Sequence, residues 1–188
     1  MSTSAIIISI LFILCLTAPV VTRAVGLVNA DDKPVKRFWI PLIFGLSQGL
    51  MAVAGYYLGK LLSHLFVDEF APYLVFVMML VVAVKMFVDS MRMLKGKMLY
   101  TVSSDWDILG LSVLAAMNTL LMSLMGWHFM PFGYWFILVV AAAGYLWSFL
   151  IVRTEFNPGM IKKLSFIEFA AAVFMAVIAI LYLFTDLI

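Results

Sequence analysis

Residues 72–94 read PYLVFVMMLVVAVKMFVDSMRML, a stretch in which apolar side chains dominate from end to end. A helix needs roughly 20 predominantly apolar residues to cross the hydrocarbon core of a bilayer, and this stretch has that length. Backbone N–H and C=O groups cannot remain unpaired in lipid, so a helix is the expected conformation. The stretch therefore predicts a transmembrane helix, and this helix carries Lys85 and Asp89 inside the membrane.

Five further segments of the same kind lie on either side of it. They cover residues 5–28, 38–65, 107–127, 132–152 and 165–186. Of the 188 residues, 66% are hydrophobic and 12% are charged, whereas a soluble domain is about half apolar and about a quarter charged. The first segment lacks the basic start and the small-residue cleavage site of a signal peptide, so we expect it to remain. The sequence thus predicts an all-α integral membrane protein with six transmembrane helices in a single membrane domain, residues 1–188.

Basic residues are distributed unevenly among the connections between these segments. The first, third and fifth connections and their borders carry Lys33, Lys36, Arg37, Arg92, Lys95, Lys97, Arg153, Lys162 and Lys163. The second and fourth connections and both ends of the chain carry none. By the positive-inside rule, the odd-numbered connections are cytoplasmic. We therefore expect a multi-pass protein of the cell inner (plasma) membrane whose two termini lie outside the cytoplasm.

A short internal similarity links the second and fifth segments. Residues 52–56 read AVAGY and residues 141–145 read AAAGY. If this marks a duplication, residues 1–100 and 101–188 are two halves of three helices, inserted in opposite orientations as in many transporters. The other interpretation is that small residues recur because they let helices pack closely. The pairs Gly45/Gly49 and Gly55/Gly59 predict such packing, and a central position, for the second segment.

Ionisable residues inside a membrane segment are costly and indicate function by default. Lys85 and Asp89 are four residues apart, so they share a helix face and we expect them to form an intramembrane ion pair. This pair could tether helices or take part in an ion pathway. Arg23 and Lys60 lie nearer to segment ends and are expected to extend towards the interface. Glu168 is expected to pair with Lys162 or Lys163.

Three neutral polar residues also lie deep in the apolar segments. They are Thr17 in the first, Gln48 in the second and Asn118 in the fourth. Thr17 precedes Ala18 and Pro19, and a proline inside a helix frees backbone carbonyl groups, which often line a site. One hypothesis is that the three residues converge on a polar transport site. The alternative is that each one links helices by hydrogen bonds.

The sequence carries no sign of enzymatic chemistry. It has no Gly-rich phosphate loop, no dinucleotide fingerprint and no His/Cys/carboxylate cluster with metal-ligand spacing. The net charge of +2 is too small to predict binding to nucleic acid. Cys15 is the single cysteine, which excludes an internal disulfide. We expect a protein that is not an enzyme, has no resident cofactor and has the lipid bilayer as its first partner.

Two segments resemble the MntP-type manganese efflux pumps. Leu42-Ile43-Phe44-Gly45, continuing through Gly55-Tyr56-Tyr57-Leu58-Gly59, is similar to their second helix. Residues 84–92, VKMFVDSMR, resemble the end of their third helix, where a basic residue, an acidic residue and an arginine recur. The resemblance implies six helices in two inverted halves. It also implies efflux of manganese or another divalent cation by alternating access.

The sequence departs from this family's pattern at the residues that carry negative charge. The resemblance implies acidic residues in the first, second and fourth helices, at the positions of Thr17, Gln48 and Asn118. Manganese favours carboxylate, carbonyl and water oxygens. Thr, Gln and Asn keep the oxygens but supply no charge to offset that of a dication. The divergence therefore bears on the activity rather than on the fold.

Three functions follow as hypotheses. The first is manganese or divalent cation efflux, with Thr17, Gln48 and Asn118 at the transport site and Lys85 and Asp89 as a gate or tether. The second is a non-transporting membrane subunit or scaffold, built on a degenerate transporter fold, that binds partner proteins. Independently of these functions, the chain could form a homodimer or a larger membrane complex. The third is transport of another solute, such as a cationic or zwitterionic one.

Overall fold

A computed structural model describes residues 3–25, 27, 34–63, 70–95, 105–125, 135–153 and 158–186. The helices in these ranges are α1 (Thr3–Thr17), α2 (Pro19–Val25), α3 (Pro34–Leu62), α4 (Ala71–Leu94), α5 (Asp105–Leu124), α6 (Trp135–Arg153) and α7 (Pro158–Asp186). Six stretches of these helices are long and apolar enough to cross a membrane. They are Ile7–Ala24, Phe38–Leu62, Ala71–Leu94, Trp106–Leu124, Trp135–Arg153 and Ile161–Phe184. The prediction of an all-α protein with six membrane helices is confirmed.

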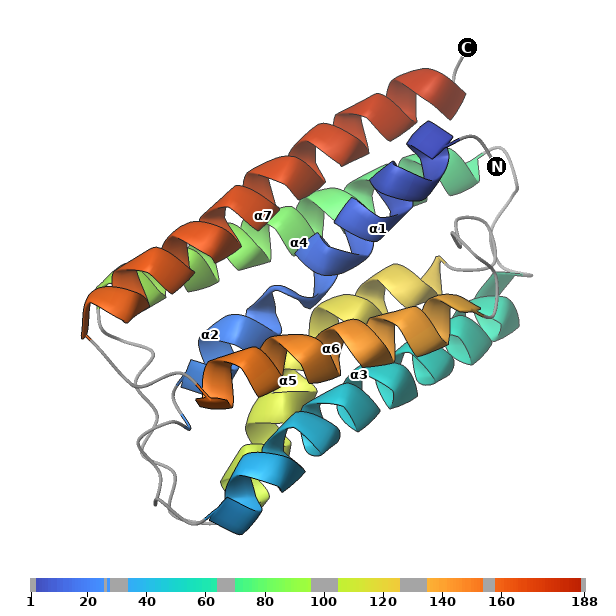
Figure 1. Cartoon of the computed structure of the whole chain (residues 1–188). Coiled ribbons are helices and arrows are strands. Elements are labelled where there is room, and N and C mark those ends of the chain that lie inside the picture. Colours follow the sequence, from blue (N-terminus) through green and yellow to red (C-terminus); the bar gives the residue numbers. More distant parts are fainter. Residues whose placement is uncertain are drawn as a thin grey trace.

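The helices form two groups with the first span between them (Figure 1). α4 packs along α7, while α3 packs against both α5 and α6. α1 and α2 contact helices of both groups, namely α5, α6 and α7. In this span 67% of residues 7–24 are buried, compared with 33–50% in the other five spans. The central helix is therefore the first span rather than the second, in contrast to what the glycine pattern predicted.

The first span is broken at its centre, as the Thr17-Ala18-Pro19 sequence predicted. α1 ends at Thr17 and α2 begins at Pro19. Pro19 has no N–H, so the carbonyl of Cys15 accepts instead from the N–H of Ala18, at 3.2 Å. The Thr17 hydroxyl donates to the carbonyl of Ile13 at 2.8 Å. Local hydrogen bonds thus satisfy part of the backbone at the break, which allows it to lie inside the protein.

Glycines set the close approach of α3 to its two neighbours. A Cβ at Gly45 would lie 3.1 Å from the Ala141 carbonyl oxygen of α6. A Cβ at Gly55 would lie 2.5 Å from the Leu120 carbonyl oxygen of α5. The predicted small-residue packing of the second span is therefore present, and its glycines serve different partners along the helix.

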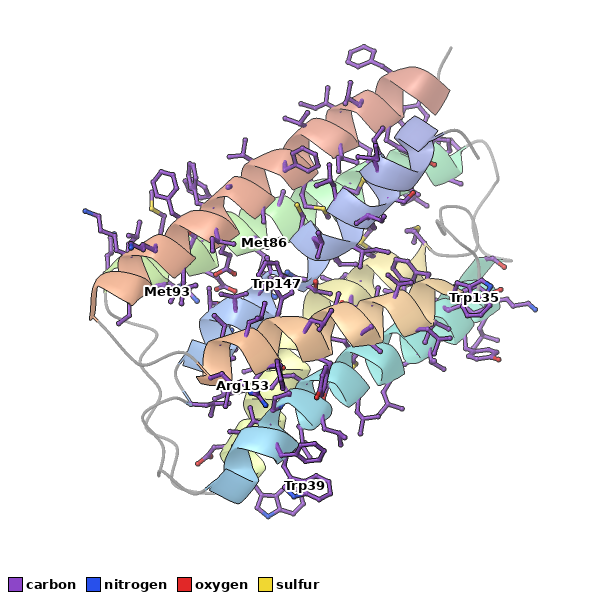
Figure 2. The ribbon with its side chains drawn as sticks, in the orientation of Figure 1. Trp39, Met86, Met93, Trp135, Trp147 and Arg153 are labelled. Atoms are coloured by element: carbon purple, nitrogen blue, oxygen red, sulfur yellow. The ribbon has the colours of Figure 1, made fainter. Side chains whose placement is uncertain are left out.

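The helices end at two opposite ends of the bundle. α1 begins and α7 ends at one of them (Figure 1), and the C-terminal ends of α2, α4 and α6 lie at the other. Exposed basic side chains at this second end are Arg92, Lys95, Arg153, Lys162 and Lys163. Trp39 and Trp135, both more than half exposed, lie at opposite ends of the bundle (Figure 2), as expected for residues of the two interfacial belts. Lys33 and Lys97 lie outside the described residues, as do the side chains of Lys36 and Arg37.

We predict that Gly55→Ala destabilises the protein by about 1–3 kcal/mol, because the added methyl group overlaps the backbone of α5. Gly110→Ala is the matched control, since a Cβ there meets nothing within 4 Å. The control should be unchanged or more stable by up to about 1 kcal/mol, because alanine is the better helix former. Denaturant unfolding in detergent micelles measures both. Equal stabilities for the two variants would contradict the packing of α3 on α5.

Candidate functional site

The strongest polar contact inside the bundle joins the first span to α4. An Nη of Arg23 lies 2.9 Å from an Oδ of Asp89, and both side chains are more than nine-tenths buried. Arg23 lies on α2, one turn after the break at Pro19. α2 itself packs against α5, α6 and α7. The prediction that Arg23 extends towards the interface is wrong. A buried partner of opposite charge retains the side chain inside the protein.

Lys85 lies one turn before Asp89 on α4 but has a different partner. Its Nζ donates to the Oδ1 of Asn118 on α5 at 2.5 Å. Among the described residues, Asp89 forms its ion pair with Arg23. The expected Lys85–Asp89 pair is therefore replaced by two contacts across helices. The two residues share a helix face, as predicted, and Asp89 still contributes a favourable Coulomb interaction to the Lys85 ammonium group.

Glu168 of α7 belongs to the same group of charges. Its side chain is fully buried and interacts electrostatically with Asp89, Arg23 and Lys85. Lys162 and Lys163, its expected partners, are exposed at the start of α7. That expectation is wrong, because Glu168 faces α2 and α4 rather than the membrane surface. We call Arg23, Lys85, Asp89 and Glu168 the charged cluster.

The sequence holds a weak signal for this cluster. All four of its residues lie within apolar spans. Charges at membrane depth are expected to pair with one another, so pairing across helices is an alternative to pairing with neighbours in sequence. The sequence of each span does not say which helices meet, and it therefore does not identify the partners.

Gln48 contacts α5 at the residue that follows Asn118 in sequence. The hydroxyl of Thr119, next to Asn118 in sequence, donates to Oε1 of Gln48. Gln48 also packs on α6, where a Cβ at Gly144 would lie 2.6 Å from its Cγ. Both amide side chains are fully buried, and neither the Nε2 of Gln48 nor the Nδ2 of Asn118 has a hydrogen-bond partner among the described residues. Unsatisfied polar atoms of this kind are unusual in a packed interior, where most buried polar groups have a partner.

Thr17 is buried at the break in the first span, but its hydroxyl is used within its own helix. It donates to the carbonyl of Ile13 at 2.8 Å and lies 3.3 Å from that of Leu14. The structure thus places Gln48 against Thr119, the neighbour of Asn118 in sequence, and it links Asn118 to the charged cluster through Lys85. It gives Thr17 the role of a hydrogen-bond donor at the break.

Serine pairs join helices at two further places. The hydroxyls of Ser90 on α4 and Ser165 on α7 each donate to the other residue's carbonyl, at 2.9 and 3.0 Å. Ser47 of α3 and Ser112 of α5 are bonded through their hydroxyls at 2.8 Å. These pairs resemble the polar links that hold helices together in lipid. In the part of the chain that the structure describes, no three His, Cys, Asp or Glu residues are grouped as metal ligands.

More than half of the chain is similar to a known family of membrane proteins. The sequence model of the MntP family, described as "Putative manganese efflux pump", matches residues 32–145, more than half of the chain. The protein belongs to the MntP family. No curated protein and no solved structure matches the chain.

The matched region of this MntP protein includes the whole of α3, α4 and α5. It therefore contains Gln48, Lys85, Asp89 and Asn118. Arg23 and Glu168, which complete the charged cluster, come from the two spans on either side of the match. The structure thus assembles one site from the matched region and from both flanking spans.

We predict that Asp89→Asn destabilises the protein by about 3–5 kcal/mol, because it leaves the Arg23 guanidinium buried without its counter-charge. Arg92→Gln, on the same helix but exposed, is the control and should change stability by less than about 0.5 kcal/mol. The free energy of unfolding in detergent micelles measures both. An Asp89→Asn protein as stable as the Arg92→Gln protein would show that the buried pair contributes nothing.

Proposed function

We propose that this MntP protein is a membrane transporter that exports manganese or a related divalent cation by alternating access between its two halves. The observation that carries the proposal is the pattern of helix packing. Apart from the contact of α1 with α2 inside the first span, each principal packing pair joins a helix from residues 1–100 to a helix from residues 101–188. A rearrangement between the halves would therefore change the whole interior.

The packing pattern also supports an inverted repeat. By their order within the two halves, the first span corresponds to α5, α3 to α6 and α4 to α7. When each span is replaced by its counterpart, the same set of principal packing pairs results. For example, the contact of α3 with α5 becomes the contact of α6 with the first span, which is also present. Three helices per half and a chain that begins and ends on one side imply that the halves have opposite orientations.

The pentapeptide similarity adds little to this support. Gly55 of the first copy approaches α5, whereas Gly144 of the second copy approaches Gln48 on α3. The two glycines therefore have different neighbours. Close helix packing, the second interpretation of the similarity, explains them better than an equivalence of position does.

For the transport site we propose the interface of Gln48 and Asn118, with the break at Thr17 on the adjoining first span. The amide oxygens of Gln48 and Asn118 are suitable ligands for a hard cation. In this conformation the oxygen of Asn118 already binds a cation, the ammonium group of Lys85. Lys85 would have to leave Asn118 before an exported cation could bind there. It is therefore suited to act as a gate that occupies the empty site.

The orientation proposed for the membrane follows from the basic side chains. The exposed Arg92, Lys95, Arg153, Lys162 and Lys163 lie at the end of the bundle opposite to the chain termini. We place this end in the cytoplasm and the termini outside the inner membrane. The charged cluster is closer to the cytoplasmic end, because Asp89 lies five residues before Leu94 at the end of α4.

A second candidate function is that of a non-transporting subunit that binds partner proteins in a larger membrane complex. The observation that favours it is the neutral character of Thr17, Gln48 and Asn118, which offers no charge to compensate a dication. Purification in a mild detergent separates the two candidates in part. A subunit should retain other proteins, whereas a transporter of this size can function as one chain or as a homodimer.

We predict that expression of this chain in a bacterial strain without its own manganese exporter lowers the manganese content of the cells. Asn118→Ala should remove the effect, because it deletes the oxygen that Lys85 now occupies. Lys60→Gln, at the exposed end of α3, should retain it. Elemental analysis of washed cells and growth in excess manganese are the measurements. Unchanged manganese content at normal membrane levels of the protein would rule out manganese export.

A further inference from the structure

Glu168 stands apart from the other members of the charged cluster because it has no close partner. Neither of its carboxyl oxygens accepts a hydrogen bond of regular geometry from the described residues. The hydroxyl of Thr22 lies near enough to interact with it, but this hydroxyl donates to the Pro19 carbonyl at 3.0 Å. The side chain is nevertheless fully enclosed by protein.

The two cations that could neutralise Glu168 are engaged elsewhere. Arg23 of α2 is paired with Asp89, and Lys85 of α4 binds Asn118. Besides these, the charged group that faces Glu168 is Asp89 itself, which repels a second negative charge. An isolated carboxylate at this depth would carry a large desolvation cost. A protonated carboxyl group avoids this cost, since the neutral form needs no counter-ion.

We propose that Glu168 is a proton-binding site and that its proton is exchanged during transport. In the conformation described here the carboxyl group carries the proton. When the halves rearrange and water reaches this group, the O–H bond breaks, the proton passes to water and the carboxylate takes Arg23 or Lys85 as its partner. Movement of Arg23 releases Asp89, and movement of Lys85 releases the oxygen of Asn118.

Charge balance explains why the two events are linked. With Glu168 protonated, the cluster holds two cations and one anion, and with Glu168 ionised it holds two of each. Ionisation therefore improves the overall balance, provided that a cation moves to Glu168. Loss of the proton is thus coupled to a change in the contacts between α2, α4 and α7, which come from both halves of the chain.

This inference rests on the proposed function for its role in transport, since the proton would be the coupling ion that drives export of the cation. The binding of the proton itself does not depend on transport. It can be measured on the purified chain whether or not manganese is moved. Two experiments therefore address the two parts.

The first experiment is infrared spectroscopy of the purified full-length chain near neutral pH. We expect a carbonyl stretch of a protonated, non-hydrogen-bonded carboxyl group that shifts in D2O. Glu168→Gln should remove this band. Asp107→Asn, which removes a carboxyl group of α5 outside the charged cluster, should leave it. Absence of the band from the unaltered chain would overturn the proposal, and this outcome does not depend on the stability of any variant. Persistence of the band in Glu168→Gln would overturn it as well.

The second experiment uses proteoliposomes with manganese and a pH-sensitive dye. Manganese movement should drive proton movement in the opposite direction, and an imposed pH gradient should accelerate manganese flux several-fold. Glu168→Gln should abolish the proton signal and the dependence on the gradient, while Lys162→Gln on the same helix should behave like the unaltered chain. Manganese flux that ignores the pH gradient would refute proton coupling. No manganese flux in any sample would instead refute the proposed function.

Discussion

The buried ion pair of Arg23 with Asp89 is the contact on which the rest of this membrane protein depends. A guanidinium group at membrane depth needs a counter-charge inside the protein, because lipid offers none. This requirement holds the first span against α4, and the neighbouring Glu168 extends the group of charges to α7. The central position of the first span and the break at Pro19 both serve this arrangement. Arg23 reaches the interior from a short separate helix, α2, rather than from a continuation of α1.

A second constraint acts through small residues. Apolar side chains gain little by leaving lipid for a protein interior, so helices associate through close contact and a few polar links. The glycines of α3 provide the close contact, and the Ser90–Ser165 pair provides a polar link between α4 and α7. Both connect residues of one half with residues of the other. The halves therefore interlock, which distinguishes this fold from two bundles that are merely side by side.

The sequence predicted the number of spans, the break in the first and the glycine packing of the second. These features are local, since they depend on length, on one proline and on spacing along one helix. It predicted partners poorly. The i, i+4 spacing of Lys85 and Asp89 suggested a pair, but Asn118 and Arg23 on other helices are closer in space. Proximity in sequence suggested Lys162 or Lys163 as the partner of Glu168, although tertiary packing turns Glu168 inward. Whether Thr17, Gln48 and Asn118 bind a transported ion stays a prediction, because spacing and burial alone do not identify a ligand.

The central claim is that the interface around Asn118, closed in this structure, opens to water during transport. Cysteine accessibility tests it directly, because Cys15 is the single native cysteine and can be replaced by serine. In that background an Ala115→Cys protein, which keeps Asn118 and places a small thiol about one turn earlier on α5, is treated in proteoliposomes with a membrane-impermeant thiol reagent. We predict slow labelling without metal, since residue 115 is fully buried, and faster labelling when manganese is added. A cysteine at this position that stays unreactive from both sides, with and without manganese, would contradict the account and favour a closed scaffold.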